Sequence, residues 1–259
     1  MDLGIAGRKA IVCASSRGLG KACARALAEA GCDVVVNGRD SARLDATAQE
    51  IAKATGVKVT AVAADLSTPE GQAKLLAACP DPDILVNNNG GPPLRDFREL
   101  TRQQMLDGVI ANMVVGIELI QKTIGPMTER RFGRIVNITS GSVKMPLAGL
   151  DLSSGARAGL TAFLAGVARS VAASNVTMNF LLPGTFDTDR LRQNFEAAAK
   201  KKGISVEAAR QERTAVVPAQ RIGDPAELGA ACAFLCSAHA GYITGQSLLM
   251  DGGAYAGTF

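Results

Sequence analysis

A turn of small residues near the start of the chain has the composition of a phosphate-binding loop. It follows the first apolar run and consists of Ala14, Ser15, Ser16, Arg17, Gly18, Leu19 and Gly20. Glycines between a strand and a helix let backbone N–H groups and the positive end of the helix approach a phosphate. A Gly-x-Gly pair alone is a weak signal, because many turns contain one. Its position at the first strand–helix junction favours a phosphate site.

The elements that position this turn are short apolar runs alternating with longer helical patterns. Strands are predicted at 9–14, 33–37, 58–63, 84–87, 134–139, 176–182 and 247–250, and helices at 18–30, 41–54, 69–78, 99–124, 153–173, 188–213 and 224–237. Continuously apolar strands are covered on both faces, and their alternation with helices indicates a parallel sheet. No linker or repeat divides the chain. We therefore predict one α/β domain over 1–259, a Rossmann-type doubly wound sheet of about seven parallel strands.

Composition excludes several classes of function. The 259 residues carry a net charge of only +4, with 4% aromatic residues and no Trp. We therefore expect no nucleic-acid partner and no membrane. The single His239 and six scattered cysteines form no zinc pattern, so no metal is expected, and free thiols indicate a reducing compartment. The N-terminus lacks the apolar stretch of a signal peptide, and no apolar run approaches the roughly 20 residues of a membrane span. The expected location is cytoplasmic.

Further motifs follow the glycine turn in a fixed order. They are Asp83-Ile-Leu-Val-Asn-Asn-Asn-Gly90, Asn112, Asn137-Ile-Thr-Ser140, Pro183-Gly184, Thr188, Tyr242-Ile-Thr-Gly-Gln246 and Asp251-Gly-Gly253. Over essentially the whole chain, they resemble the short-chain dehydrogenase/reductase family, with the closest likeness to its 3-oxoacyl-[acyl-carrier-protein] reductase branch. The resemblance implies an oxidoreductase that uses a nicotinamide dinucleotide.

The same resemblance implies which residues bind the cofactor. In the family loop, Thr-Gly-x-x-x-Gly-x-Gly, Cys13 stands for the Thr and Ala14 for the first Gly, which needs a permissive backbone angle. Asn89 replaces the family's Ala beside the ribose. The implied cofactor residues are positions 14–20 of the turn, Asn37, Arg39, Asp65, Leu66, Asn88, Asn89, Gly90, Arg157, Pro183, Gly184 and Thr188.

Charge at the end of the second strand favours NADP(H) over NAD(H). NAD sites place an acidic residue there to bind the ribose 2′-hydroxyl. Here the strand ends in Asn37-Gly38-Arg39, with no acidic residue before Asp40. Arg39, together with Arg17 in the glycine turn, suits a 2′-phosphate. The alternative is that both are solvated surface charges.

The family's catalytic group is Asn, Ser, Tyr and Lys, and this chain keeps only half of it. Asn112 and Ser140 match the first two, whereas the Tyr position is Ser153 and the Lys position is Arg157. A serine hydroxyl is a far weaker acid than a phenol, whose pKa is about 10, and its oxygen ends nearer the backbone. Arg157 stays protonated, but it can bind a ribose and stabilise a developing alkoxide.

Three residues could replace the missing proton donor, and each has a simpler interpretation. Lys144 on the loop after Ser140 is more often a solvated surface lysine, and Asp151 more often a helix N-cap. Tyr255 could reach a site if the C-terminal tail folds over it, although a disordered tail is the commoner outcome.

Two other segments carry expectations about partners. The predicted helix 153–173 is rich in Gly and Ala. Glycines in a helix interior cost roughly 1 kcal/mol each, and close packing against a helix or a cofactor would compensate for that cost. The alternative is a tolerated Ala-rich helix. Together with helix 99–124 it resembles the family's association helices, which predicts a homotetramer. Segment 188–215 corresponds to the substrate-covering lid, and its basic residues could attract an acyl carrier or simply be solvated.

Two functions are consistent with the sequence. The first is an NADPH-dependent reductase of a small-molecule carbonyl or imine with an altered proton-transfer site. An iminium substrate would fit, since it arrives already protonated. The second is a dinucleotide-binding sensor or subunit that has lost catalysis. The retained Asn112 and Ser140 favour the first function, and the lost Tyr and Lys favour the second.

Overall fold

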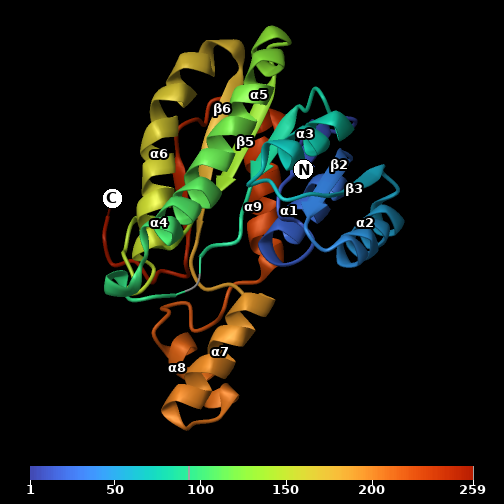
Figure 1. Ribbon diagram of the computed structural model, residues 1–259. Coiled ribbons are helices and arrows are strands. Elements are labelled where there is room, and N and C mark those ends of the chain that lie inside the picture. The colour runs from blue at the N-terminus through green and yellow to red at the C-terminus, as the bar shows by residue number, and fades with distance from the viewer. Residues whose placement is uncertain (93, 259) are drawn as a thin grey trace.

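The computed structural model describes residues 1–92 and 94–258 and contains one parallel sheet between two helical layers (Figure 1). The strand order is β3-β2-β1-β4-β5-β6-β7, and every neighbouring pair is parallel. The strands are β1 Lys9–Val12, β2 Asp33–Gly38, β3 Val59–Ala63, β4 Ile84–Asn87, β5 Gly133–Ile138, β6 Val176–Pro183 and β7 Ser247–Met250. The predicted doubly wound seven-stranded sheet is confirmed.

The helices that cover the sheet divide into two sets, and each set closes its own apolar core. One core joins α1 (Gly18–Glu29), α2 (Ser41–Thr55) and α9 (Pro225–Cys236) to one face of the strands. The other joins α3 (Pro69–Ala78), α5 (Val115–Glu129) and α6 (Asp151–Val171) to the opposite face. Successive strand residues such as Ile11 and Val12 belong to different cores, because strand side chains alternate between faces.

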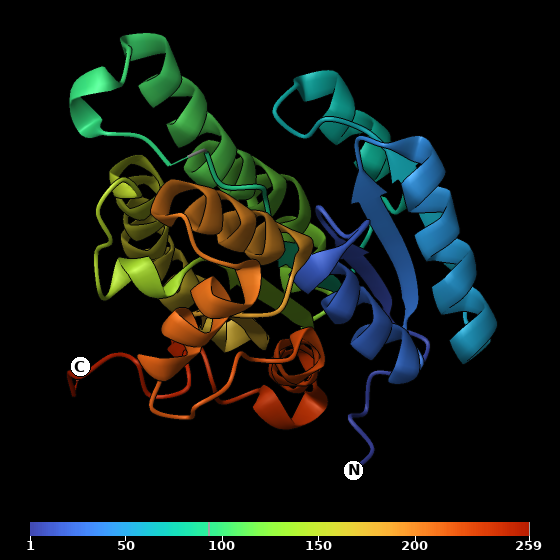
Figure 2. The same cartoon turned by 90° about the horizontal axis from the view of Figure 1, so that it is seen from below.

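Two predicted helices are interrupted in the structure. Helix 99–124 is a short 3₁₀ turn, Phe97–Glu99, then α4 (Arg102–Val109), a π turn at Ile110–Val114, and α5. Helix 188–213 is α7 (Asp189–Lys202) and α8 (Val206–Ala215). The break follows from Gly203, which ends α7 in the left-handed conformation, and from Ser205, whose side chain caps α8. These two helices stand apart from the layers, at the lower end of Figure 1, and Figure 2 looks onto them from below.

The helical run from Arg102 to Glu129 has the length and apolar composition of a membrane span, with a mean hydropathy of 1.2. The composition argument had missed this run. Its α5 section contributes Leu119, Ile120 and Met127 to the core beneath the sheet. We therefore assign its α5 section to the core of the fold.

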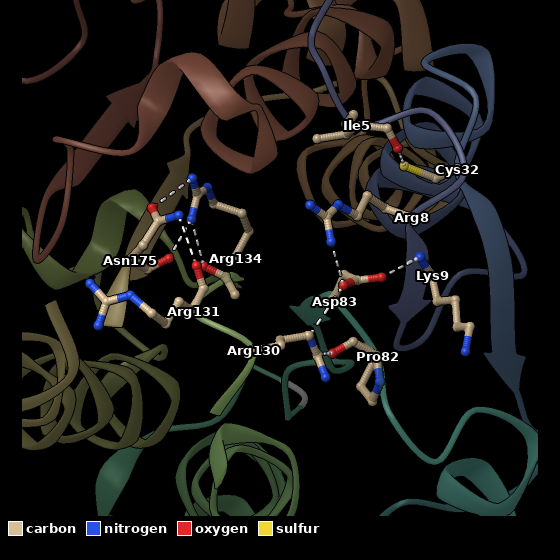
Figure 3. Close-up of polar contacts among 11 residues, drawn as sticks. Ile5, Arg8, Lys9, Cys32, Pro82, Asp83, Arg130, Arg131, Arg134 and Asn175 are labelled. Carbon is tan, nitrogen blue, oxygen red and sulfur yellow. Dashed lines mark hydrogen bonds and ion pairs between the residues drawn. The ribbon is translucent and has the colours of Figure 1, made fainter. Parts of the chain in front are cut away.

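The amino ends of the strands are closed by a dense polar network, shown in Figure 3. The carboxylate of Asp83 accepts hydrogen bonds from the Arg8 side chain at 3.1 Å and the Lys9 backbone at 2.9 Å, and it forms an ion pair with Arg130 at 3.2 Å. Arg134 at the start of β5 is fully buried beside this cluster. The network ties β1, β4 and β5 together at the end of the sheet opposite the glycine turn.

All six cysteines are buried and unpaired. Burial raises the pKa of the Cys13 thiol to about 12, so this residue stands beside the glycine turn as a small apolar side chain. All six cysteines therefore belong to the apolar core.

Candidate active site

The glycine turn takes a conformation that only small residues allow. Ala14, where the family has Gly, lies in the left-handed region with φ 45°, and Gly18 has φ 57°. A Cβ on Gly20 would lie 2.3 Å from the Ala14 carbonyl oxygen, so the first turn of α1 requires a glycine at that position. The N-terminus of α1 has no side-chain cap and no acidic residue in its first turn. Its backbone N–H groups and positive helix end therefore favour an anion.

Ser15 and Asn37 hold the glycine turn against the sheet. Ser15 is completely buried; its hydroxyl donates to the Val12 carbonyl at 2.7 Å and accepts from the Asn37 N–H at 3.0 Å. The Asn37 amide donates to the carbonyls of Val62 and Ala64, both at 3.1 Å. Since these side chains are engaged by the backbone, their contribution to a cofactor site is to fix the turn.

The ribose end of the predicted cofactor site is lined by exposed cations. Arg17 and Arg39 are both exposed, and Arg17 lies 3.6 Å from Asp189 at the start of α7. Asp40 accepts the Arg43 backbone N–H at 3.1 Å and thereby caps α2. The first acidic residue after β2 is thus committed to a helix cap.

The residues that follow β3 and β4 are held by local hydrogen bonds. Asp65 is exposed, and its carboxylate accepts from the Ser67 N–H, while the neighbouring Leu66 is buried in the core. Asn88 donates to the Ala14 carbonyl at 3.2 Å and so joins β4 to the glycine turn. Asn89 donates to the Ala111 carbonyl at 2.7 Å, which ties the end of β4 to the π turn. Gly90 is exposed.

Ser153 and Arg157 lie one turn apart on α6 and bond to each other. Arg157 Nε donates to Ser153 Oγ at 3.2 Å, Nη1 to the Ile138 carbonyl at 2.9 Å and Nη2 to the Asn89 carbonyl at 3.2 Å. Both residues are buried, and in the described part of the chain Arg157 forms no ion pair with a carboxylate. Burial, with a smaller contribution from the positive charge of Arg190, lowers the pKa of Arg157 to about 10. The guanidinium is therefore a fixed cation at the carboxyl ends of β4 and β5.

Asn112 lies in the π turn, which directs it toward Arg157. Its amide donates to the Gly108 carbonyl at 3.1 Å, and its Oδ1 is buried with no partner in residues 1–92 and 94–258. Asn112, Asn87 and Arg157 line a small pocket of about 20 Å³, which is large enough for one water molecule. A π turn at such a position is a frequent feature of functional sites.

A larger cavity of about 730 Å³ opens at the same edge of the sheet. It is lined by Ser140, Ser153 and Arg157, by the loop after β6, and by side chains of α7 and α8. From the predicted cofactor set, Leu19, Asn88, Asn89, Pro183, Gly184 and Thr188 also line it. The structure thus brings together three of the four predicted catalytic residues, while Asn112 stands behind Arg157.

Sequence reasoning missed several residues of this cavity. Ser142 lines it, and its buried hydroxyl has no partner among the described residues. Arg213 of α8 also lines it and donates to the Thr185 hydroxyl. Arg190, one of the basic lid residues that the sequence had indicated as a possible attraction for an acyl carrier, lines the same wall and donates to the Gly91 and Pro92 carbonyls. Basic residues in segment 188–215 were the available signal, but their periodicity is that of a solvated helix.

The three substitute proton donors occupy different places. Lys144 is half-buried on the loop after β5. Asp151 is exposed and already helical, because the cap position of α6 is Leu150, so the predicted N-cap is wrong. The predicted disordered tail is also wrong: Tyr255 is half-buried, its backbone N–H is bound by Asp251 at 2.8 Å, and it lines the cavity.

Comparison with known proteins identifies the family. A family profile described as "Enoyl-(Acyl carrier protein) reductase" matches residues 13–255. The chain belongs to the short-chain dehydrogenase/reductase family of oxidoreductases. It is 32% identical to the NADPH-dependent reductase BacG of Bacillus subtilis over 95% of this chain and 97% of that protein. It is 34% identical to the 3-oxoacyl-[acyl-carrier-protein] reductase FabG of Vibrio cholerae over 98% and 99% of the two chains.

Solved structures agree with this assignment. The NADPH-dependent reductase YwfH, involved in bacilysin biosynthesis, superposes with a TM-score of 0.91 at 31% identity, over 98% of this chain and all of that one. The L-sorbose reductase of Gluconobacter frateurii, complexed with NADPH and L-sorbose, superposes with a TM-score of 0.95 at 28% identity over the full length of both chains.

Proposed function

We propose that this chain is an NADPH-dependent oxidoreductase that reduces a carbonyl of the 3-oxoacyl type, or an imine, in the cavity beside Arg157. NADPH is the cofactor of BacG, YwfH and the L-sorbose reductase described above, and 3-oxoacyl-[acyl-carrier-protein] is the substrate in the name of FabG. The observation that carries the proposal is Arg157: a buried guanidinium, held by two carbonyl oxygens at the strand ends and by the Ser153 hydroxyl, on the wall of a large cavity.

The residues present fit a bound NADP(H). The turn from Ala14 to Gly20 and the uncapped α1 would hold the pyrophosphate, since no side chain competes for the first N–H groups of that helix. Arg39 and Arg17 would bind the 2′-phosphate of the adenosine ribose. Asp65 would lie at the adenine, and Asn89, Gly90 and Thr188 near the nicotinamide half.

Each residue of the cavity then has a distinct part in the reaction. When bound, the cofactor supplies a hydride to the substrate carbon. Ser140 would donate a hydrogen bond to the substrate oxygen, and the positive charge of Arg157 would stabilise the charge that develops there. Ser153 would keep the guanidinium in place through its bond to Nε. Asn112 would support Arg157 from behind.

The lid and the charge of the cavity bear on the substrate. Helices α7 and α8 contribute both apolar and basic side chains to the wall, including Phe195, Val216, Arg190 and Arg213. An acyl chain with a polar or acidic end would suit that mixture, and a carrier-linked substrate is consistent with the basic surface of segment 188–215. An iminium is the second suitable class, because it needs no proton donor of its own.

A second function is favoured by the chemistry of the substituted pair. The Ser153 hydroxyl is a weak acid that already accepts a bond from Arg157, and Arg157 does not release its proton near neutral pH. A dinucleotide-binding sensor or subunit without turnover would need neither group to transfer a proton.

The two functions are separated by one experiment. NADPH and NADH binding are titrated, and NADPH oxidation is then followed with 3-oxoacyl thioesters, ketones, quinones and cyclic imines. We expect tight NADPH binding and turnover of at least one class. Tight binding with no turnover in any class favours the sensor, and tighter NADH than NADPH binding contradicts the cofactor assignment.

A homotetramer and a cytoplasmic location stay predictions. In α6, Gly159 packs near the sulfur of Met113, but nothing lies within 4 Å of the Cβ positions of Gly155 and Gly166. Phe163 of the same helix is 50% exposed. These features support α6 as an association surface, and light scattering that reports a monomer at micromolar concentration would contradict it.

A further inference from the structure

The proposed function leaves the source of the proton open. Ser153 is buried and bonded to Arg157, and its hydroxyl is a far weaker acid than a phenol. Arg157 has a pKa of about 10 and stays cationic during turnover near neutral pH. Reduction of a neutral carbonyl nevertheless needs a proton for the oxygen.

A phenol lines the same cavity from another part of the chain. Tyr255 lies in the tail after β7, is half-buried, and shares the cavity wall with Ser140 and Arg157. The chain has only two tyrosines, and the other, Tyr242, is fully exposed. Tyr255 is therefore the tyrosine that the fold directs to the site.

The tail is held in place by Asp251. Its carboxylate accepts the Gly253 N–H at 2.9 Å and the Tyr255 N–H at 2.8 Å, which closes a turn directly before the phenol. Asp251 also packs on the loop after β6, since a Cβ on Gly184 would lie 2.6 Å from the Asp251 Cβ. Gly141, the residue after Ser140, faces the same loop, with its Cβ position 3.4 Å from the Pro183 carbonyl oxygen. The tail and the Ser140 loop thus both pack against residues 183–184 at the end of β6.

A cation accompanies the phenol. Lys144 Nζ lies 5.7 Å from the centroid of the Tyr255 ring, on the loop that begins at Ser140. A cation over an aromatic ring is attracted to its negative face, so Lys144 helps to orient the ring of Tyr255. The phenol that lines the cavity comes from the tail, and the lysine over its ring comes from the β5 loop.

We propose that Tyr255 is the proton donor of this site and that Lys144 is its positioning partner. The inference rests on the proposed function. The Tyr255 O–H bond breaks and its proton passes to the substrate oxygen, while the carbonyl carbon accepts the hydride from NADPH, which is oxidised to NADP⁺. The phenolate then regains a proton from water.

The first test measures the position of Tyr255 without any turnover. The protein is nitrated with tetranitromethane in the presence and absence of NADP⁺, and the two tyrosines are quantified by peptide mass spectrometry. We expect NADP⁺ to slow nitration of Tyr255 several-fold and to leave Tyr242 unchanged. Equal nitration of Tyr255 with and without NADP⁺ overturns the proposal.

The second test measures the reaction. For Tyr255→Phe we expect kcat with acetoacetyl-coenzyme A or phenanthrenequinone to fall by about 100-fold, the scale of general acid catalysis. NADPH affinity should stay within about twofold, because Tyr255 is not a predicted cofactor ligand. Tyr242→Phe is the matched control and should keep wild-type kcat. Lys144→Met should lower kcat, and Lys144→Arg should restore most of it, which a merely structural loop residue would not require.

The outcomes separate this inference from the proposed function. Turnover by the wild type together with near-normal kcat in Tyr255→Phe overturns Tyr255 as donor and leaves the proposed function intact. If the wild type reduces none of the probes, the proposed function fails, and the nitration experiment alone tests where Tyr255 lies. Protection by NADP⁺ then supports Tyr255 at the cofactor, and its absence overturns that placement as well.

Discussion

The two ends of the sheet each bury an arginine, but they use it differently. At the amino end, Arg134 donates to the Asn175 carbonyl at 2.8 Å (Figure 3). It also donates to the Ser237 carbonyl at 3.0 Å and stacks on Phe132 at 4.4 Å. At the carboxyl end, Arg157 also donates to carbonyl oxygens, but one side of it borders a cavity of about 730 Å³.

Burial lowers the pKa of both guanidinium groups, to about 10 for Arg157. At Arg134 the cost of desolvation is offset by bonds that join β5 to the chain before β6 and after α9. At Arg157 fewer hydrogen bonds offset the cost of desolvation, and the positive charge borders the cavity. A buried charge whose hydrogen bonds join separate segments stabilises the fold, whereas a charge at a cavity wall is available to a ligand.

Of the variants that test this comparison, Arg157→Met should have the largest effect. We expect kcat to fall by about 10²–10³-fold, the usual cost of removing a group that stabilises a developing oxyanion. The free energy of unfolding should change by less than about 1 kcal/mol, because a buried cation is removed and the Ile138 and Asn89 carbonyls that it leaves belong to residues of the cavity wall, where water can bind them. Steady-state kinetics and urea unfolding measure the two quantities.

The stability difference also has a pH dependence. The folded-state pKa of Arg157, about 10, lies below its usual value of 12.5, so between these values the unfolded chain binds more protons. Wild-type stability relative to Arg157→Met should therefore be constant below pH 10 and rise above it. A difference that falls with pH in that window would contradict the lowered pKa.

Arg134→Met is the reciprocal variant. It leaves the carbonyls of Ser237 and Asn175 buried without their donor, and the expected loss of unfolding free energy is about 3 kcal/mol. Activity per folded molecule should stay near wild type at temperatures below the transition. If Arg134→Met lowers kcat while stability holds, the division of roles between the two ends is wrong.

The comparison also explains which features could be predicted from the sequence. Continuous apolar runs gave β4 and β7 to the residue, and Asp224, Pro225 and Glu227 marked the start of α9, where a capping box forms. The positions of Ser153 and Arg157 followed from family spacing. These features depend on short-range patterns, which local sequence carries.

Other features depend on contacts between distant segments, and the sequence could not supply them. The π turn around Asn112 interrupts an otherwise continuous helical pattern, and no residue type marks it. Tyr255 reaches the cavity only because Asp251 binds the backbone of the tail. Both are consequences of tertiary packing at the carboxyl end of the sheet.

Exposed arginines at the carboxyl end provide a smaller test. Arg39→Ala should weaken NADPH binding by roughly 1–3 kcal/mol, the scale of a charged hydrogen bond, and leave NADH binding nearly unchanged. Arg43→Ala is the matched control, because Arg43 is also exposed but lies near Asp40 at 3.9 Å. Fluorescence titration with both cofactors measures the effect. Equal losses of binding free energy for NADPH and NADH would mean that Arg39 attracts both cofactors through its positive charge and does not contact the 2′-phosphate.

The smallest expected effect concerns backbone strain. Ala14 at the carboxyl end and Arg131 at the amino end both adopt positive φ, 45° and 54°. Ala14→Gly should raise the free energy of unfolding by about 1 kcal/mol or less, because relief of left-handed strain exceeds the entropy that glycine adds to the unfolded chain. Arg131→Gly should gain nothing, since it also loses the bond from its guanidinium to the Ala173 carbonyl at 3.0 Å. Thermal unfolding of the two variants measures both effects. A gain in Ala14→Gly alone means that the strain at Ala14 is not offset, whereas the strain at Arg131 is offset by its side-chain hydrogen bond. A loss of stability in Ala14→Gly would mean that its methyl group packs against the turn and contributes more than its φ angle costs.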